Sequence, residues 1–168
     1  MTRGPRYNVK PRRRREGRTD YRRRLSLLRS GKTRIVVRKT LNNTIIQFID
    51  YKENGDNILV TANSNELKKK YKWKFSTSTT PAAYLTGLLA GKKAKDKGIS
   101  DCILDMGRHP PVTGSKIFAS LKGITDAGIN CPFNEEKFPS EDRIMGKHLD
   151  SSIMPTLNDI KNEIIGGK

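Results

Sequence analysis

The chain has 168 residues, of which 34 are Lys or Arg and 17 are Asp or Glu, so its formal net charge is +17. This length suits one domain with a hydrophobic core, and no apolar run approaches the roughly 18 residues that a membrane span requires. The absence of an apolar segment after the N-terminal charges argues against a secretory signal, and two cysteines, Cys102 and Cys131, are too few for a zinc ribbon or a disulfide framework, so the cytoplasm is the expected compartment.

The positive charge is concentrated at the N-terminal end. Residues 1–39 hold 16 basic and 2 acidic residues, a balance of +14, whereas residues 40–168 hold 18 and 15, a balance of +3. The densest stretch is KPRRRREGRTDYRRR at 10–24. Phosphates neutralised by such charges release their condensed counterions, so a polyanion is the expected partner.

Residues 1–18 predict a basic arm without a core of its own. Val9 is the one core aliphatic beyond Met1, and such a segment is expected to be unstructured when free. A short helix should follow, with Thr19 as its N-cap and an end at Gly31. Its apolar face would dock and its basic face would meet phosphates: Tyr21, Leu25 and Leu28 on the first, and Arg22, Arg23 and Arg29 on the second.

Three β-branched runs predict an antiparallel meander over residues 33–41, 44–51 and 57–64. The spacer Asn42-Asn43 fits a tight hairpin, and residues 53–56 fit a longer one with Gly55 at a positive φ. Polar residues on the strands, such as Gln47 and Thr61, leave one face of the sheet open to a ligand.

Residues 66–70 predict a short polar helical turn, and 71–75 alternate aromatic and basic side chains. Two interpretations of this alternation stay open. Trp73 and Phe75 could stack on nucleobases, or they could close the edge of the core.

A helix over 81–97 with Thr80 as cap and Pro81 at its first position should cross over to a buried strand at 101–105. That connection favours parallel pairing. The small residues Ala83, Gly87, Gly91 and Ala94 allow close approach to a neighbouring element. A further helix is expected over 115–127, and the polar residues beyond 131 should wrap over the body as an extension.

The order β-β-β-α-β-α resembles a ribonuclease H-like motif, which raises the possibility of a nuclease. Two-metal cleavage needs converging carboxylates, one of them usually on the first strand. TRIVVRKTL has none, and Asp50, Glu66, Asp101 and Asp105 suit strand ends and caps. His109 and His148 are isolated, so we expect no catalytic site, no metal and no cofactor.

Four stretches carry a family resemblance: RGPRY (3–7), RRRREGRTDYRRRLSLLRSGKTRIVVRKT (12–40), PAAYLTGLLAGKKA (81–94) and ILDMG…GSKIFASLKGITDAGI (103–129). They resemble the archaeal form of large-subunit ribosomal protein eighteen, from about residue 3 to residue 130. The resemblance implies an α/β, ribonuclease H-like domain without the nuclease site. It also implies a structural protein of the central protuberance that binds 5S rRNA.

The resemblance further implies contacts of the arm and of the open sheet face with 5S rRNA, and of arm and tail with 23S-type rRNA. The resemblance also implies neighbouring ribosomal proteins as partners, including the other 5S rRNA-binding protein. It implies no association with a membrane. On the arm, the implied RNA-binding residues are Arg3, Arg6, Tyr7, Arg12, Arg13, Arg14, Arg15, Arg18, Arg22 and Arg24; on the hairpin, they are Lys32, Arg34, Arg38, Lys39 and Asn42.

Arginine suits this use because its fork pairs with phosphate and its plane stacks on bases. The expected division is an arm with a short helix over 1–31, a globular α/β domain that binds 5S rRNA over 32–130 and an extension over 131–168. The alternative to a ribosomal constituent is a non-ribosomal RNA-binding chaperone, which would share the basic arm but not the ordered matches in the body.

Overall fold

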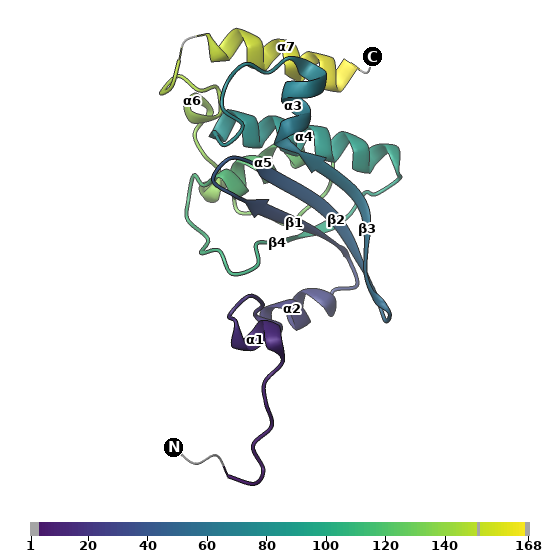
Figure 1. Ribbon diagram of the computed structural model, residues 1–168. Helices are drawn as coiled ribbons and strands as arrows, with labels where there is room; N and C mark the ends of the chain where they lie inside the picture. The colour runs from purple at the N-terminus through teal and green to yellow at the C-terminus, as the bar shows by residue number, and fades with distance from the viewer. Residues whose placement is uncertain (1–3, 151, 167–168) are drawn as a thin grey trace.

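A computed structural model describes residues 4–150 and 152–166, and its centre is a four-stranded sheet (Figure 1). The strands β1 (Thr33–Lys39), β2 (Thr44–Lys52), β3 (Gly55–Asn63) and β4 (Cys102–Asp105) lie in the order β3-β2-β1-β4. β1, β2 and β3 pair antiparallel, and β4 pairs parallel with β1. The predicted α/β fold, a meander plus one parallel strand, is confirmed.

The two hairpin connections have the opposite lengths from those predicted. β2 and β3 are joined by Glu53 and Asn54 alone, with Gly55 at φ 135° as the first paired residue. The connection of β1 to β2 is the wider one, residues 40–43, in which the Thr40 hydroxyl donates to the Asn43 carbonyl and accepts from its N–H. A backbone hydrogen bond of 2.8 Å from the Thr40 N–H to the Asn43 carbonyl closes the same connection.

One face of the sheet is covered by α4 (Thr80–Asp96) and α5 (Lys116–Asp126), which pack closely on each other. The cap of α4 is Thr79 rather than Thr80, and its hydroxyl accepts from the N–H of Ala82. A Cβ on Gly87 would overlap the backbone oxygen of Ser120, and one on Gly123 would overlap that of Tyr84. The small-residue contact predicted for this helix is confirmed.

The sheet buries the alternate residues that face these helices. Ile35 and Val37 on β1 and Ile46 and Phe48 on β2 are all buried. Trp73 joins the same core at 2 % exposure, and its Nε1–H donates to the Ser76 carbonyl. The core interpretation of Trp73 is therefore correct, and the stacking interpretation is wrong for it.

The outer layer above α4 contains α3 (Ser64–Tyr71) and α7 (Ile153–Gly166), and the turns η1 (Glu135–Lys137) and α6 (Glu141–Ile144) lie between α5 and α7 in the chain (Figure 1). The fourteen-residue helix α7 was not predicted. It buries Ile153, Leu157, Ile160 and Ile164 in the common core. The extension thus contributes a packed helix where only short apolar segments were expected.

The N-terminal segment lies beyond one end of the sheet as α1 (Arg12–Arg15) and α2 (Tyr21–Leu28) (Figure 1). Residues 4–16 are all exposed, and the single turn α1 was not predicted. The cap of α2 is Asp20, not Thr19, because the Asp20 carboxylate accepts from the N–H groups of Arg22 and Arg23. α2 buries no residue and Leu25 is 52 % exposed, so its predicted apolar face docks only in part.

Candidate nucleic-acid interface

Arginines from four parts of the chain surround one hollow of about 450 Å³. The hollow lies between the α1–α2 segment, the open face of β1 and the loop after β4, and we call it the arginine hollow. Its lining includes three carboxylates, Asp20, Asp56 and Asp105. The cationic residues that line it are Arg13, Arg18, Arg23, Arg24, Arg34, Arg38 and Arg108.

Polar contacts hold the basic segment against the sheet. Nη2 of Arg24 lies 2.8 Å from both oxygens of Asp56, and Nη1 of Arg23 donates to the Gly107 carbonyl at 3.2 Å. Gly17 has a φ of 63°, and a Cβ there would overlap the guanidinium of Arg108. The N-terminal segment is therefore positioned by hydrogen bonds and ion pairs rather than by apolar burial.

Arg34 is the centre of an ion-pair cluster and is only 2 % exposed. Its Nη1 donates to Asp105 Oδ2 at 2.9 Å, and its Nη2 lies 3.0 Å from Asp56 Oδ1 at an angle unsuited to a hydrogen bond. The two carboxylates come from different strands. Asp105 is the last residue of β4 and pairs with Val36 of β1, and Asp56 is the second residue of β3.

The expectation that Arg34 projects from an open sheet face is wrong. The alternation along β1 does place it on the face away from the helices, but the basic segment and the two carboxylates cover it. Arg34 therefore lies beneath the basic segment, paired with Asp105 and Asp56. β1, the first strand, carries this guanidinium and no carboxylate.

The ionisation of Asp56 follows from its two arginines. Partial burial alone would raise the pKa of Asp56, but the hydrogen bonds from Arg24 and the charges of the Arg24 and Arg34 guanidiniums outweigh it and hold the pKa below its usual value. Asp56 is consequently charged near neutrality and fixes both arginines.

The predicted RNA-binding residues divide into those that the fold gathers and those that it leaves apart. Arg13, Arg18, Arg24, Arg34 and Arg38 line the arginine hollow. Arg3 lies outside the described residues. The remaining predicted residues are exposed and do not line the hollow: Arg6, Tyr7, Arg12, Arg14, Arg15, Arg22, Lys32, Lys39 and Asn42.

Two lining arginines were not among the residues that the resemblance implied. Arg23 was predicted on the phosphate-facing side of the short helix, and it does line the hollow. Arg108 follows β4, the strand paired with β1, so the parallel pairing was the available signal for its position. Conversely, Lys39 alternates onto the opposite side of β1 from Arg38 and lies away from the hollow.

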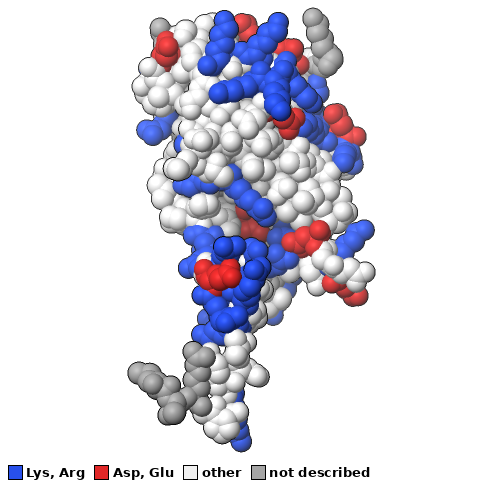
Figure 2. Space-filling view, viewed as in Figure 1, with Lys and Arg blue, Asp and Glu red and all other residues white. Residues whose placement is uncertain are grey.

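Figure 2 shows basic side chains over the N-terminal segment and again at the opposite end of the molecule. The second group lies near α3, whose Lys68, Lys69 and Lys70 are exposed. The first group surrounds the arginine hollow. In the part of the chain that the structure describes, no three His, Cys, Asp or Glu side chains come together as metal ligands, and no helix is long and apolar enough to cross a membrane.

Comparisons with known proteins agree on one family. Residues 5–99 match the family model described as ribosomal large subunit proteins 60S L5, and 50S L18. The chain is 52 % identical over 151 residues to the large ribosomal subunit protein uL18 of Korarchaeum cryptofilum, covering 90 % of this chain and 77 % of that protein. Proteins of the same name from Methanothermobacter thermautotrophicus and Aeropyrum pernix are 50 % and 48 % identical over 149 residues, 89 % of this chain and 77 % and 70 % of theirs.

Proposed function

We propose that this chain, which belongs to the family of ribosomal large subunit proteins 60S L5 and 50S L18, binds 5S rRNA and helps attach it to the large-subunit rRNA in the central protuberance. It is a structural component of the large subunit of the cytoplasmic ribosome and not an enzyme. Membership of this family removes the basis for a non-ribosomal RNA chaperone, since the similarity extends over 90 % of the chain.

The observation that carries the proposal is the arginine hollow. Its lining has seven arginines and three carboxylates, an excess of four positive charges, and two of the carboxylates hold arginines in place. Arg13, Arg18 and Arg38 are exposed on its rim, where Arg18 pairs with Glu16 at 3.0 Å and Nε of Arg13 donates to the Thr19 hydroxyl. A rim of this kind accommodates RNA phosphates, which position a protein on RNA without specifying a sequence.

The arm and the sheet would have different tasks on the RNA. Residues 4–16 are exposed along their whole length, so they can follow a groove between RNA helices and neutralise phosphates of 5S or 23S-type rRNA. The open face near Arg38 is held rigidly by the sheet, so it can distinguish one RNA shape from another. Neighbouring ribosomal proteins, including the other 5S rRNA-binding protein, are the proposed protein partners.

The test is a direct comparison of 5S rRNA with an unrelated RNA of equal length at one salt concentration. We expect tighter binding to 5S rRNA by a factor of at least about 10, corresponding to about 1.4 kcal/mol. Arg13→Ala should weaken both complexes equally, because the arm contacts phosphates. Equal affinity of the unaltered chain for both RNAs would contradict the proposed 5S specificity.

A further inference from the structure

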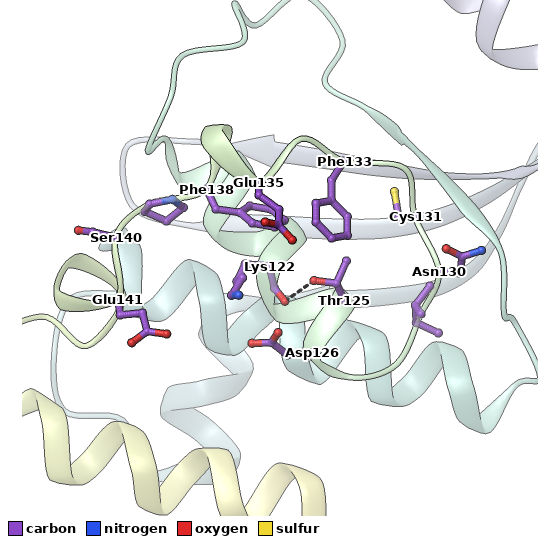
Figure 3. Close-up of a pocket in the computed structure, with 12 residues that line it drawn as sticks. Lys122, Thr125, Asp126, Asn130, Cys131, Phe133, Glu135, Phe138, Ser140 and Glu141 are labelled. Carbon is purple, nitrogen blue, oxygen red and sulfur yellow. Dashed lines mark hydrogen bonds between the residues drawn. The ribbon is translucent and has the colours of Figure 1, made fainter.

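A second hollow, of about 710 Å³, lies on α5 and shares no lining residue with the arginine hollow (Figure 3). One wall is the last turns of α5, from Lys122 to Asp126, and the other is the chain from Ile129 to Glu141. We call it the acidic hollow. RNA binding, as proposed above, uses none of its residues.

Its aromatic wall is formed by Phe133 and Phe138, whose ring centroids lie 4.8 Å apart. Nζ of Lys122 lies 5.5 Å from the centroid of Phe138, so this wall already holds one ammonium group. Phe133 is 47 % exposed, and no cation lies over its ring among the described residues. One aromatic face is therefore open to a second cation.

The charges around this wall are negative. Asp126, Glu135 and Glu141 line the hollow against the single Lys122, an excess of two negative charges in a chain of net charge +17. Figure 3 shows Glu135 beside the two phenylalanines, with Asp126 beyond the hydrogen bond from Thr125 to the Lys122 carbonyl. Glu135 and Glu141 have no ion-pair partner among the described residues.

The backbone adds to this negative field. α5 ends at Asp126, beside the hollow, and the C-terminal carbonyls of a helix carry partial negative charge. One oxygen of Asp126 accepts a hydrogen bond of 2.8 Å from the Tyr84 hydroxyl, which fixes the carboxylate at the end of the helix. Carboxylates, helix end and aromatic ring together favour a cation and disfavour a phosphate.

The ligand that fits is a long cationic side chain. An arginine or lysine has an apolar stem for Phe133 and N–H donors for the carboxylates, whereas a bare metal ion needs ligands that converge. No such convergence of metal ligands occurs in the described part of the chain. The thiol of Cys131, which also lines the hollow, is protonated at neutral pH because burial raises its pKa to about 11, so it offers no thiolate.

We propose that the acidic hollow is a docking site for a basic extended segment of another protein, one of whose arginine or lysine side chains inserts between Phe133 and the carboxylates of Glu135 and Asp126. The volume of the hollow, about 710 Å³, accommodates more than one side chain, so flanking residues of the segment lie along Glu141. The charge on this face complements basic protein segments, as the arginine hollow complements RNA.

The test uses the full chain without RNA and two short probes, N-acetyl-Gly-Arg-Gly-Arg-Gly-amide and the same peptide with Gln in place of Arg. Amide resonances are followed during titration. We expect the Arg peptide to shift the signals of Thr125, Asp126 and Phe133 in a saturable manner, and the Gln peptide to leave them unchanged.

Variants of equal charge separate the hollow from the general field. Glu135→Gln should weaken Arg-peptide binding at least about threefold, in line with an exposed ion pair plus a cation–π contact. Its neighbour Glu136 does not line the hollow, so Glu136→Gln should weaken Arg-peptide binding by less than about 1.5-fold. Affinity for 5S rRNA should be the same in both variants and in the unaltered chain.

Three results would overturn the proposal. The first is shifts of equal size with the Gln peptide. The second is equal weakening by Glu135→Gln and Glu136→Gln. The third is a 5S rRNA titration that perturbs Thr125 and Phe133, which would make this face part of the RNA interface instead. Loss of 5S binding alone, with the peptide shifts intact, would contradict the proposed function and leave the docking site standing.

Discussion

The N-terminal segment and the body of this protein are built by different forces. Residues 4–31 include no buried residue, and ion pairs and hydrogen bonds from Arg23 and Arg24 fix them on the sheet. The body buries a continuous core from Ile35 to Ile164, and the charge balance of residues 40–168 is only +3. Charge and packing are therefore separable here: a change in one region should alter binding and a change in the other should alter stability.

The largest expected effect is at the crossing of α4 and α5. Gly123→Ala places a methyl group on the backbone of Tyr84 and Leu88, which has no room to move within a packed helix pair. We expect a loss of about 3 kcal/mol in the free energy of unfolding, measured by denaturant titration.

The matched control for this substitution is Gly4→Ala in the arm, where a Cβ meets no atom within 4 Å. It should leave the free energy of unfolding unchanged. Equal stability of the two variants would show that the body does not depend on the close approach of these helices.

A smaller effect is expected where the two regions meet. Asp56→Asn keeps the size of the side chain but removes the charge that Arg24 and Arg34 share, so the buried Arg34 keeps only Asp105 as an ion-pair partner. The expected loss is about 2 kcal/mol, with faster amide exchange in α2. Asp96→Asn, an exposed carboxylate at the end of α4, is the control and should change neither quantity.

The same carboxylate predicts a pH dependence of stability. The pKa of Asp56 is lower in the folded chain than its usual value of 3.8, so the unfolded chain binds the proton more readily. Its contribution is complete above the usual value and is lost as the pH falls through the lower, folded value. Unfolding free energies from pH 6 down to pH 2.5 should therefore fall more steeply in the unaltered chain than in Asp56→Asn, and parallel curves would refute this role.

The smallest expected effect concerns single charges on β1. Arg38→Ala should weaken 5S rRNA binding about threefold to tenfold and weaken an unrelated duplex less, because Arg38 is held on the rigid sheet whereas Arg13 belongs to the arm. Lys39→Ala removes the same charge from the other side of the strand and should cost less. Equal losses from both substitutions on both RNAs would mean that the sheet does not discriminate.

Much of the fold could be predicted because local patterns agreed with it. Ile35 and Val37 alternate along residues 33–39 and are both buried, and the helix before Cys102 correctly implied a parallel strand. The sequence of α7 also has a helical pattern, since its buried residues recur at helical spacing: Ile153, Leu157, Ile160 and Ile164. Pro155 and the polar residues around it concealed that signal, although proline is tolerated in the first turn of a helix.

The interface was harder to predict, because its key contacts join distant residues. Arg34 is 71 positions from Asp105 in the sequence, and the residues around Arg34 do not indicate that Asp105 and Asp56 are its partners. An arginine on a strand with one open face therefore suggested an exposed contact. That residues 1–18 are unstructured when the protein is free of RNA stays a prediction. The division of the chain into arm, domain and extension also stays a prediction.

The most direct test of the central claim is the salt dependence of RNA affinity for the full chain and for residues 19–168. Residues 1–18 carry eight Lys and Arg. If half of these neutralise phosphates, deleting the segment should reduce the slope of log affinity against log salt by about 3, at roughly 0.7 to 0.9 per phosphate. The free energy of unfolding should stay the same. An unchanged slope would show that the body, not the arm, carries the phosphate contacts, and would contradict the account.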